Sequence, residues 1–501
     1  MEIEYVIVQA GGKGTRLKHL TENKPKALVP VNNLPLIFHL FAEFPDKKFI
    51  IIADHKKEVL REYMECFATV KYLIVDAQGT GTCAGVGKAL NYLDENTPFL
   101  LIWSDLILPK GFSLPEERQD YIGISQTFPC RWSYENGRFK EERSTEHGVA
   151  GFFIFTDKSK LEGVPDSGEL VRWMQGEALS LKELGLAGTR EFGVIEEYNK
   201  LEKDRCRPFN KVTIRDDVVL KEGIDEQGKK LAVREAAWYK AAGRAAVQEE
   251  QMMLPRIYGT DPLVMERIHG KNIYEYDSLS YSEKKDILDK LIGALKSLHD
   301  SAHIPADPFS MREAYYRKTV ARLNTIRDLV PFADREKIIV NGKVCRNVFF
   351  HKRELESRLA GIRCESFCLI HGDCTFSNLM LREDGSPVLI DPRGYFGYTE
   401  IFGDPLYDWA KLYYSIVGNY DRFNLKEFEL KIMEEGITLK VQSNHWEDME
   451  EDFFRLTRAS EQEIKLIHAV IWLSLTTYAW QDFDSICGAF YNGLYYLEEV
   501  L

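Results

Sequence analysis

Residues Gln9–Leu17, with the sequence QAGGKGTRL, constrain the fold more than any other segment because they place three glycines within four positions. The apolar run before them, Tyr5–Gln9, predicts a short buried strand. Glycines directly after a strand let the backbone turn tightly and approach a ligand closely. Backbone N–H groups in such a turn can bind phosphate oxygens, and Lys13 and Arg16 add positive charge. The loop has neither the Gly-Lys-Ser/Thr end of a P-loop nor GxGxxG spacing, so it predicts a phosphate site of another kind.

The first hundred residues alternate short apolar runs with amphipathic stretches. The apolar runs predict buried strands at Tyr5–Gln9, Phe49–Ala53, Tyr72–Val75 and Phe99–Trp103. The amphipathic stretches predict helices at Glu58–Phe67 and Ala84–Leu93. Strands that alternate with helices imply a parallel sheet with helices on its faces. Ligands of such sheets bind at the carboxyl ends of the strands, which is where Asp54 and Asp105 lie.

A second cationic segment, Lys24–Pro30 with the sequence KPKALVP, sets Lys26 beside a rigid proline. GGxGTRL followed by KPKALVPV resembles the signature of the nucleoside-triphosphate:sugar-phosphate nucleotidyltransferases, and the resemblance covers about residues 1–203. It implies an α/β domain with a Rossmann-like, mostly parallel sheet. The nucleotide-binding positions that it implies are Ala10, Gly11, Gly12, Gly14, Thr15, Gln78, Gly79 and Thr80. It also implies that Arg16 and Lys26 contact phosphates during catalysis and that Asp105 binds Mg²⁺.

The nucleotidyl-transfer reaction that this resemblance implies suits these residue types. A phosphate monoester carries nearly two negative charges and needs no general base to act as a nucleophile. Mg²⁺, lysine and arginine would offset the repulsion between the two anions as pyrophosphate leaves. The segment Gly148–Phe152 resembles the strand that lines the acceptor site in this family.

Two points about the metal site stay open. The family often has a second metal-binding aspartate in a D-x-G-T turn, and the similar segment here, Glu191–Val194, reads EFGV. Glu191 could replace that aspartate, although its side chain is one methylene longer. Asp105 could instead cap the turn that follows its strand.

A second constellation begins at His371–Leu379, HGDCTFSNL, and continues at Leu389–Gly394, LIDPRG. The spacing between Asp373 and Asn378 equals that of the protein-kinase catalytic loop. Asp373 would accept the proton of an attacking hydroxyl group. Asn378 and Asp391 would hold Mg²⁺ against the phosphates of ATP through oxygen ligands.

HGDxxxxN with a following I-D is similar to the aminoglycoside phosphotransferase and choline kinase group, over about residues 205–420. The similarity implies an α+β domain with the two lobes of a protein-kinase-like fold. The nearest candidate for a phosphate-covering loop, Arg207–Val212, contains no glycine, so the cover over the phosphates must differ.

The same similarity implies further nucleotide contacts. Val218–Lys221 resembles the strand that ends in the phosphate-pairing lysine. Glu235 could pair with Lys221 or could be a solvated helix residue. Leu263–Glu266 resembles the hinge strand whose backbone would hold an adenine edge, which assigns Glu266 to the nucleotide site.

Three features near this site have two readings each. Asp408 could position the catalytic loop or could cap a helix N-terminus. Arg393 could meet a phosphate or form an internal ion pair. A late aromatic set could form a cage for a quaternary ammonium such as choline, although its helical spacing favours core packing; its members are Trp472, Tyr478, Trp480, Phe483, Tyr491 and Tyr495.

The length of 501 residues predicts two or three domains. A charged segment, Lys200–Arg207, predicts the boundary, which gives one domain at residues 1–203 and a second at 204–501. Within the second, the expected small lobe is about residues 205–266 and the helical large lobe is about 267–501. Beyond Tyr281 helical periodicity dominates, and one short strand pair is expected to interrupt it, formed by Phe367–Ile370 and Pro387–Ile390.

Charge and apolar content exclude several classes of protein. A formal charge of −13 and a pI of about 5.5 argue against a general nucleic-acid binder. No apolar run is long enough to predict a membrane span, and the first residues lack the pattern of a signal peptide. Nine cysteines without a CxxC pair predict reduced thiols rather than a metal knuckle. The expected location is the cytoplasm.

Two adjacent catalytic domains predict two consecutive reactions. The kinase would phosphorylate a small alcohol, amino alcohol or sugar with ATP, and the nucleotidyltransferase would join that phosphate to a nucleotide from CTP or another NTP, both with Mg²⁺. Activated compounds of this kind feed the assembly of surface polysaccharides or lipids. The alternatives are two domains with unrelated substrates, one half that only binds nucleotide in a regulatory role, or antibiotic phosphorylation by the second half. The acceptor, the base preference and the oligomeric state stay open.

Overall fold

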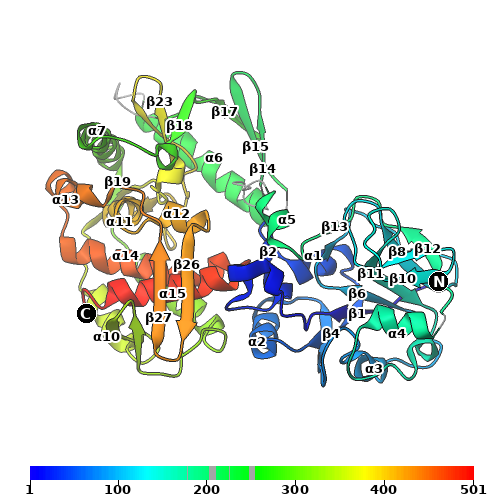
Figure 1. The fold of residues 1–501 in the computed structure, drawn as a ribbon. Helices are drawn as coiled ribbons and strands as arrows, with labels where there is room; N and C mark the ends of the chain where they lie inside the picture. Colours follow the sequence, from blue (N-terminus) through cyan, green and yellow to red (C-terminus); the bar gives the residue numbers. More distant parts are fainter. Residues whose placement is uncertain (178, 202–209, 225, 247–253) are drawn as a thin grey trace. The chain divides into compact units, whose positions relative to one another are not determined.

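The computed structural model describes residues 1–177, 179–201, 210–224, 226–246 and 254–501. It divides into two compact units (Figure 1). The first comprises Met1–Asp204 with the short segment Trp480–Asp484, and the second comprises Arg205–Ala479 and Ser485–Leu501. The predicted boundary near residue 204 lies outside the described residues. Across those residues, no helix has both the length and the apolar character that a membrane span requires.

The first unit is built on a nine-stranded mixed sheet whose centre is parallel. Its parallel strands, in spatial order, are β5 (Lys71–Asp76), β4 (Lys48–Ala53), β1 (Tyr5–Gln9) and β6 (Phe99–Trp103). β11 (Gly148–Phe155) continues the sheet antiparallel to β6. The four predicted strands are therefore confirmed, and the sheet is mostly parallel as expected.

The other strands of the first unit are β2 (Pro30–Val31), β3 (Leu34–Pro35), β7 (Leu106–Ile107), β8 (Tyr121–Ser125), β9 (Ser133–Glu135), β10 (Arg138–Lys140), β12 (Lys182–Gly185) and β13 (Arg190–Glu191). Of these, β8, β9, β10 and β12 belong to the same sheet, whereas β2 with β3 and β7 with β13 form two separate pairs. The helices are η1 (Thr15–Thr21), η2 (Lys26–Leu28), α1 (Leu36–Glu43), α2 (Lys57–Phe67), α3 (Val86–Leu90), η3 (Lys158–Leu161), α4 (Leu170–Gly176) and α5 (Ile195–Asn199). The predicted helix at residues 84–93 is shorter in the structure, because Gly85 adopts a φ of 80° and helix α3 begins after it.

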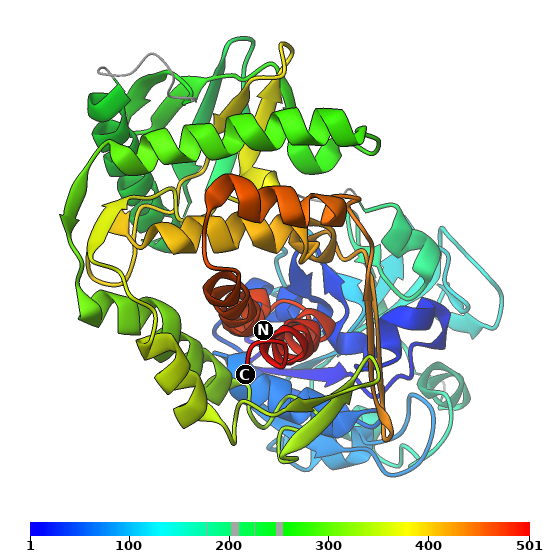
Figure 2. The ribbon, with the colours of Figure 1, turned by 90° about the vertical axis from the view of Figure 1, so that its left-hand side faces the viewer.

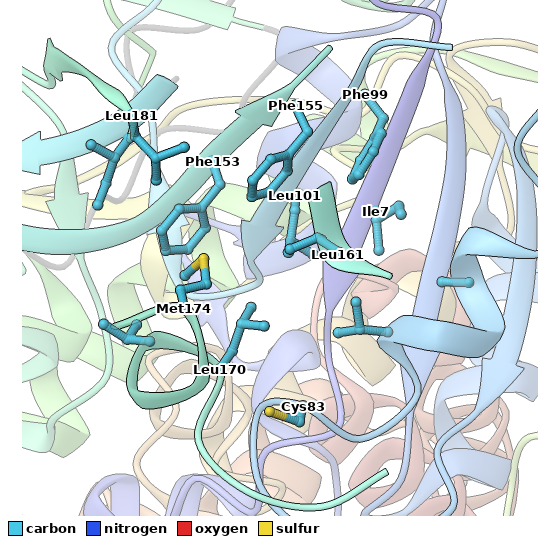
Figure 3. Packing of buried hydrophobic residues seen from close by; sticks show 14 of the residues in the cluster. Ile7, Cys83, Phe99, Leu101, Phe153, Phe155, Leu161, Leu170, Met174 and Leu181 are labelled. Carbon is cyan, nitrogen blue, oxygen red and sulfur yellow. The ribbon is translucent and has the colours of Figure 1, made fainter. Parts of the chain in front are cut away.

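A hydrophobic core lies against the sheet of this unit (Figure 3). Inward-facing side chains of the strands, among them Ile7, Leu101 and Phe153, meet apolar residues of the covering segments, such as Leu161 and Met174. These side chains are all buried, so the sheet is a rigid base. The loops at the carboxyl ends of β1 and β6 are held by this base.

The second unit begins with a four-stranded antiparallel sheet. Its strands, in spatial order, are β14 (Asn210–Ile214), β15 (Val218–Gly223), β17 (Leu263–Glu266) and β16 (Ile257–Thr260). Helix α6 (Glu226–Ala246) packs on β15. A sheet with one helix is the small-lobe arrangement expected from the sequence.

Helices make up most of the rest of the second unit, from the green to the red part of the ribbon (Figure 2). They are η4 (Ile273–Glu275), α7 (Tyr281–Asp300), α8 (Pro308–Arg312), η5 (Glu313–Arg317), α9 (Lys318–Thr325), α10 (Lys352–Ala360), η6 (Phe376–Asn378), α11 (Pro405–Ile416), α12 (Tyr420–Asn424), η7 (Glu447–Met449), α13 (Glu450–Thr457), α14 (Glu461–Leu475), η8 (Thr476–Ala479) and α15 (Phe483–Leu497). Helices α11 and α14 pack on each other. Trp472 of α14 and Tyr491 of α15, both from the late aromatic set, are buried.

The prediction of one strand pair in the helical region was wrong. β22 (Ser366–Leu369) pairs with β19 (His303–Pro305) and β25 (Phe402–Gly403), whereas β24 (Pro387–Leu389) pairs with β23 (Leu379–Arg382). β18 (Gly270–Asn272) joins the second of these sheets. The two runs therefore belong to different sheets and do not pair with each other.

A further sheet in the helical region was not predicted. It contains, in spatial order, β21 (Lys343–Arg346), β20 (Lys337–Val340), β27 (Gly436–Val441) and β26 (Phe428–Met433). The buried and exposed positions of β20 alternate strictly, and β26 and β27 form a hairpin. The alternation is a strand signal that the prevailing helical periodicity on either side obscured.

Candidate active sites

The glycine-rich loop after β1 lies against the Lys26 segment. Gly14 adopts a φ of 63°, and a Cβ atom there would lie 2.9 Å from Cγ2 of Thr21 and 3.1 Å from Cβ of Lys26. A Cβ atom on Gly11 would lie 2.9 Å from Cβ of Asp54. Only glycine fits at these two positions, so the loop and Lys26 are brought together as the sequence predicted.

The exposed side of this loop leaves several predicted contacts open to solvent. Gly12, Thr15 and Arg16 are exposed, whereas Ala10 is buried and its N–H donates to the carbonyl oxygen of Ile52 at 2.9 Å. The loop is thus fixed to the sheet at Ala10, while its exposed backbone is accessible to an anion such as a triphosphate.

The loop at Gln78–Thr82 is tied to a neighbouring segment. Gly79 has a φ of 116°, and a Cβ atom there would lie 1.8 Å from the carbonyl oxygen of Asp166. The N–H of Thr80 donates to Oγ of Ser167 at 3.1 Å. Nε2 of Gln9 on β1 donates to the carbonyl oxygen of Thr82 at 2.5 Å. The two predicted nucleotide loops are thus joined, while the side chain of Gln78 is exposed.

Lys26, Asp105 and Glu191 form one charged cluster beyond the end of β6. Asp105 is 4% exposed and forms an ion pair with Nζ of Lys26. Strand β13 pairs with β7, which opposes Glu191 to Leu106, and the N–H of Phe192 donates to the carbonyl oxygen of Asp105 at 2.9 Å. Arg16 lies 3.9 Å from Oε1 of Glu191. Residues from four separate segments therefore meet at one point.

The two carboxylates of this cluster repel each other. Burial and the negative charge of Asp105 raise the pKa of Glu191 to about 7. Burial also acts against ionisation of Asp105, but the Lys26 ammonium group outweighs it and holds the pKa of Asp105 below its usual value. Two adjacent carboxylates with one lysine fit a divalent cation, which would relieve the repulsion through oxygen ligands. Asp105 and Glu191 are the residues that would hold it.

In the second unit, Asp373 lies between an amide and a lysine. Nδ2 of Asn378 donates to Oδ2 of Asp373 at 3.0 Å and to its carbonyl oxygen at 2.9 Å. Nζ of Lys411, on α11, lies 2.9 Å from Oδ1 of Asp373. The predicted catalytic pair is thus in contact, and both carboxylate oxygens are oriented by donors.

Lys221 at the middle of β15 joins the small sheet to the predicted metal aspartate. Its ammonium group lies 2.7 Å from Oε2 of Glu235 on α6 and 2.8 Å from Oδ1 of Asp391. Burial opposes the charge of Lys221, but the two carboxylates raise its pKa above the usual value. Burial raises the pKa of Glu235 to about 7. Glu235 is therefore a buried partner of Lys221 and not a solvated helix residue.

Asn378 and Asp391 are adjacent, as a shared cation would require. The N–H of Ile390 donates to the carbonyl oxygen of Asn378 at 3.0 Å, and Asp391 follows in the left-handed region with a φ of 55°. Because Asn378 gives its amide N–H to Asp373, its amide oxygen is the atom that could face a metal ion. An amide oxygen beside a carboxylate fits Mg²⁺, which needs few protein ligands when phosphates supply the others. Over the described residues, no group of three or more His, Cys, Asp and Glu side chains is placed to hold a metal.

Asp408 holds the backbone of the loop that contains Asp373. It is fully buried in the first turn of α11, where Oδ2 accepts the N–H of His371 at 2.8 Å and Oδ1 accepts the N–H of Gly372 at 2.6 Å. Nε2 of His299 lies 2.9 Å from Oδ2. Burial acts against the charge, but the His299 hydrogen bond outweighs it and holds the pKa of Asp408 below its usual value. The helix cap is a different residue, Asp404, which accepts the N–H of Leu406.

We expect Asp408→Asn to destabilise the second unit by about 2–5 kcal/mol, because a buried charge-assisted network loses its acceptor. The asparagine oxygen could accept only one of the two backbone N–H groups and its N–H₂ would face the other donor, so the loop that carries Asp373 should shift. Phosphoryl transfer should fall with little change in the KM for ATP. Thermal unfolding and steady-state kinetics would measure both effects. The matched control is Asp286→Asn, on an exposed i,i+4 pair with Lys290, which should cost less than about 0.5 kcal/mol. Equal stability of the two variants would contradict this prediction.

Glu266 lies where predicted, at the end of β17, but its polar groups are engaged. Its carboxylate binds Arg382 at 2.7 Å and accepts the N–H of Arg256, and its own N–H donates to the carbonyl oxygen of Arg256 at 2.8 Å. Arg393 has no carboxylate within 4.0 Å in the described chain; its guanidinium group donates to the hydroxyl groups of Tyr395 and Tyr407. Of the two roles considered for Arg393, a phosphate contact and an internal ion pair, the ion pair is therefore not formed within the described residues.

Sequence reasoning missed the cations that accompany Asp373. Lys411 contacts Asp373. Burial lowers the pKa values of Lys318 and Arg322, and the nearby charge of Arg393 lowers them further. Lys411 follows Tyr407 by one helical turn, and Arg322 follows Lys318 by one turn of α9. The i,i+4 spacing places the two side chains of each pair on one face of a helix, but no motif connects them to Asp373.

Sequence models of known families match a part of each unit. Residues 6–113 match the sequence model of the MobA-like NTP transferase domain, and residues 218–429 match that of the phosphotransferase enzyme family (APH). The first range contains the glycine-rich loop, Lys26 and Asp105, and the second contains Lys221, Asp373 and Asp391.

Individual relatives match parts of the chain. The bifunctional protein GlmU of Methanocaldococcus jannaschii is 33% identical over 103 residues, which are 20% of this chain and 24% of that protein. The UTP–glucose-1-phosphate uridylyltransferase AglF of Haloferax volcanii is 39% identical over 62 residues, 12% of this chain and 26% of that protein. Over these and the other curated relatives compared, the matches span between 24% and 32% of the relatives' length.

Solved structures resemble each unit at low identity. The CTP:phosphocholine cytidylyltransferase LicC of Streptococcus pneumoniae superposes with a TM-score of 0.31 and 21% identity, over 40% of this chain and 97% of that chain. A gentamicin–APH(2")-IIa complex superposes with a TM-score of 0.37 and 15% identity, over 57% of this chain and 87% of that chain.

Proposed function

We propose, on the premise that this chain is a nucleotidyltransferase domain fused to an APH-family kinase domain, that the two domains catalyse consecutive steps on one small metabolite. The second domain would phosphorylate a hydroxyl group with ATP. The first would join the resulting phosphate to a nucleotide, with CTP as the expected donor. The product would be a nucleoside-diphosphate derivative that supplies surface polysaccharide or lipid decoration.

In the first step, the hydroxyl oxygen of the acceptor attacks the γ-phosphorus of ATP, and the bond from that phosphorus to the β,γ-bridging oxygen breaks. Asp373 would accept the hydroxyl proton. The hydrogen bond from Asn378 orients the Asp373 carboxylate for this transfer. Lys221 would bind ATP phosphates, supported by Glu235. Mg²⁺, held by Asn378 and Asp391, would offset the charge of the phosphates. The products are ADP and a phosphate monoester.

In the second step, an oxygen of the phosphate monoester attacks the α-phosphorus of the NTP. The bond from the α-phosphorus to the α,β-bridging oxygen breaks, and pyrophosphate leaves. Lys26 and Arg16 would bind the phosphates and Asp105, with Glu191, would hold Mg²⁺. The remaining nucleotide-binding positions would be those of the two glycine loops. No proton has to be removed, because the monoester is already an anion.

The observation that carries this proposal is that each unit contains a full set of charged groups for its own step. Glu191 lies next to Asp105, and this second carboxylate in the altered turn supports a role for both residues in holding Mg²⁺. A regulatory first half would need no such arrangement. Likewise, Asn378 contacts Asp373, its carbonyl oxygen accepts the N–H of Ile390, which directly precedes Asp391, and Asp391 pairs with Lys221. CTP is proposed because small phosphorylated alcohols are usually carried as CDP derivatives.

Incubation of the full chain with ATP, Mg²⁺ and one of CTP, UTP or GTP tests the proposal directly. Neutral, cationic and anionic hydroxylated compounds serve as acceptors, and mass spectrometry follows both products. We expect one acceptor class to give first a monophosphate and then a nucleotide adduct, with pyrophosphate in equal amount. Chelation of Mg²⁺ should stop both steps. A monophosphate that is never converted, even when supplied pure with each NTP, would show that the halves act on unrelated substrates or that the first half only binds nucleotide.

A further inference from the structure

A cluster of four cations lies beside the catalytic aspartate, and it is defined here as Lys318, Arg322, Arg393 and Lys411. Lys318 and Arg393 line a cavity of about 80 Å³ together with the aromatic residues Tyr395 and Tyr407. Lys411, one turn beyond Tyr407 on α11, lies 2.9 Å from Oδ1 of Asp373. The cavity therefore adjoins the group that would take the acceptor's proton.

The cluster has few anions to balance it. Lys411 is paired with Asp373. Arg393 donates to two tyrosine hydroxyl groups, and Arg322 donates to the carbonyl and hydroxyl oxygens of Ser474. Within the described ranges, no carboxylate lies within 4.0 Å of the charged atoms of Lys318, Arg322 or Arg393.

Glu313 is the one residue lining the cavity that carries a carboxylate; it attracts Lys318, but its hydrogen bond and its ion pair are formed with other residues. Its carboxylate accepts the hydroxyl group of Tyr398 at 3.1 Å and lies 3.6 Å from Nε of Arg317. Burial, together with Arg393, Arg322 and Lys411, lowers the pKa of Lys318 well below the usual value. Like charges gathered in a half-buried site cost free energy, and a bound anion would recover it.

The aromatic rings at this site are already covered by cations. The guanidinium carbon of Arg393 lies 4.3 Å from the ring centre of Tyr395 and 5.6 Å from that of Tyr407, and Nζ of Lys318 lies 5.9 Å from the latter. Arg234 lies 4.8 Å from the ring centre of Tyr395. A quaternary ammonium group would need these same ring faces, so a choline-like acceptor is disfavoured here by both charge and space.

The cluster is separate from the cation expected to meet ATP. Lys221 is paired with Asp391 and Glu235, whereas the cluster is joined to Asp373 through Lys411. We propose that Lys318, Arg322 and Arg393 bind an anionic group of the acceptor and so make the kinase specific for hydroxylated carboxylates, phosphates or phosphonates. This inference rests on the proposed phosphoryl transfer at Asp373. The acceptor's hydroxyl group would then lie at Asp373 while its anionic group fills the cavity.

Matched acceptors in the full chain test this specificity. Glycerate and glycerol phosphate are compared with glycerol, and 2-hydroxyethylphosphonate is compared with ethanolamine and choline, by ADP release. We expect a kcat/KM at least about tenfold higher for the anionic member of each set, as a charge-assisted hydrogen bond would give. Among the anionic probes, the carboxylate, phosphate and phosphonate arms distinguish the group that fits. Faster turnover of choline, ethanolamine or glycerol would overturn the inference.

The variant Lys318→Met removes the charge and keeps the length of the side chain. We expect it to raise the KM for the preferred anionic acceptor about tenfold or more and to leave the KM for ATP within twofold. Lys290→Met, at an exposed ion pair on α7, is the matched control and should change neither constant. A rise in the KM for ATP instead would assign the cluster to the nucleotide and overturn the inference.

A binding measurement separates this inference from the proposed function. Calorimetric titration of the full chain with the same anionic probes and with inorganic phosphate needs no turnover. Binding that Lys318→Met weakens, without any phosphoryl transfer, would support the anion site and refute the kinase step for these compounds. No binding of any anionic probe to the unmodified chain would overturn the anion site, whatever the catalytic result.

Discussion

Asp373→Asn is expected to lower acceptor-dependent ADP formation by about 10²–10⁴-fold, the usual contribution of a positioned general base. Asparagine has nearly the shape of aspartate but cannot accept the hydroxyl proton. It would also leave Lys411, which lies 2.9 Å from Oδ1, without its anionic partner. The KM for ATP should change little, because Lys221 and Asp391 keep their contacts and Asn378 keeps its hydrogen bond to the backbone carbonyl of residue 373.

The same variant reports on the order of the two steps. Formation of the nucleotide adduct from ATP, NTP and free acceptor should stop, and addition of the phosphorylated acceptor should restore it. Asp384→Asn is the matched control, because Asp384 only accepts hydrogen bonds from Ser386 in the exposed turn between β23 and β24. Retention of more than a tenth of the activity by Asp373→Asn would refute the role of Asp373 as the base.

The fold was largely predictable because short apolar runs and their spacing are local signals. Strands β1 and β6 and strand β17 have the predicted limits in the structure. The errors came from pairing, which is not local. β22 and β24 were recognised as strands but were paired with each other, although the structure gives them separate partners. The sheet that contains β20 and β27 joins residues about 100 positions apart, as the pairing of Val340 with Ile437 shows.

The candidate sites were predictable where a motif fixes both residue type and spacing. The contact of Asn378 with Asp373 follows from a spacing of five residues, and the contact of Lys221 with Glu235 follows from a strand and the next helix. Lys318 and Arg322 belong to no such motif and lie more than 50 residues before Asp373 in the chain. Their approach to Arg393 depends on how α9 packs, which no local pattern encodes. The specificity of the acceptor site is therefore the part that required the structure.

Asp105→Asn is expected to lower nucleotidyl transfer by about 10²–10³-fold, comparable to the loss of one electrostatic stabiliser of a transition state. Asp105 is 4% exposed, so the substitution removes a charge that solvent cannot replace. Lys26 would lose its ion-pair partner, and the cation site would keep only Glu191. The kinase step should be unaffected, so the monophosphate should accumulate.

Mass spectrometry of the reaction with ATP and NTP would show this accumulation, and Mn²⁺ binding by the variant would show whether the metal is lost. Asp46→Asn, at an exposed position of the same unit, is the matched control and should leave both products unchanged. Normal adduct formation by Asp105→Asn would mean that the metal-binding role assigned to this aspartate is wrong and that the residue only caps its turn.

Glu191→Gln separates the two carboxylates of this site. Burial and the charge of Asp105 raise the pKa of Glu191 to about 7, whereas the pKa of Asp105 lies below its usual value. Near neutral pH, Glu191 is therefore less fully ionised than Asp105. The neutral variant should therefore lose less activity than Asp105→Asn, about tenfold, and should bind Mn²⁺ more weakly than the unmodified chain. A loss equal to that of Asp105→Asn would make Glu191 an equal metal ligand, and an unchanged affinity for Mn²⁺ would remove it from the metal site. The first result would show that the longer glutamate side chain replaces the aspartate of this turn as a metal ligand. The second would show that Glu191 lies beside the cation without binding it.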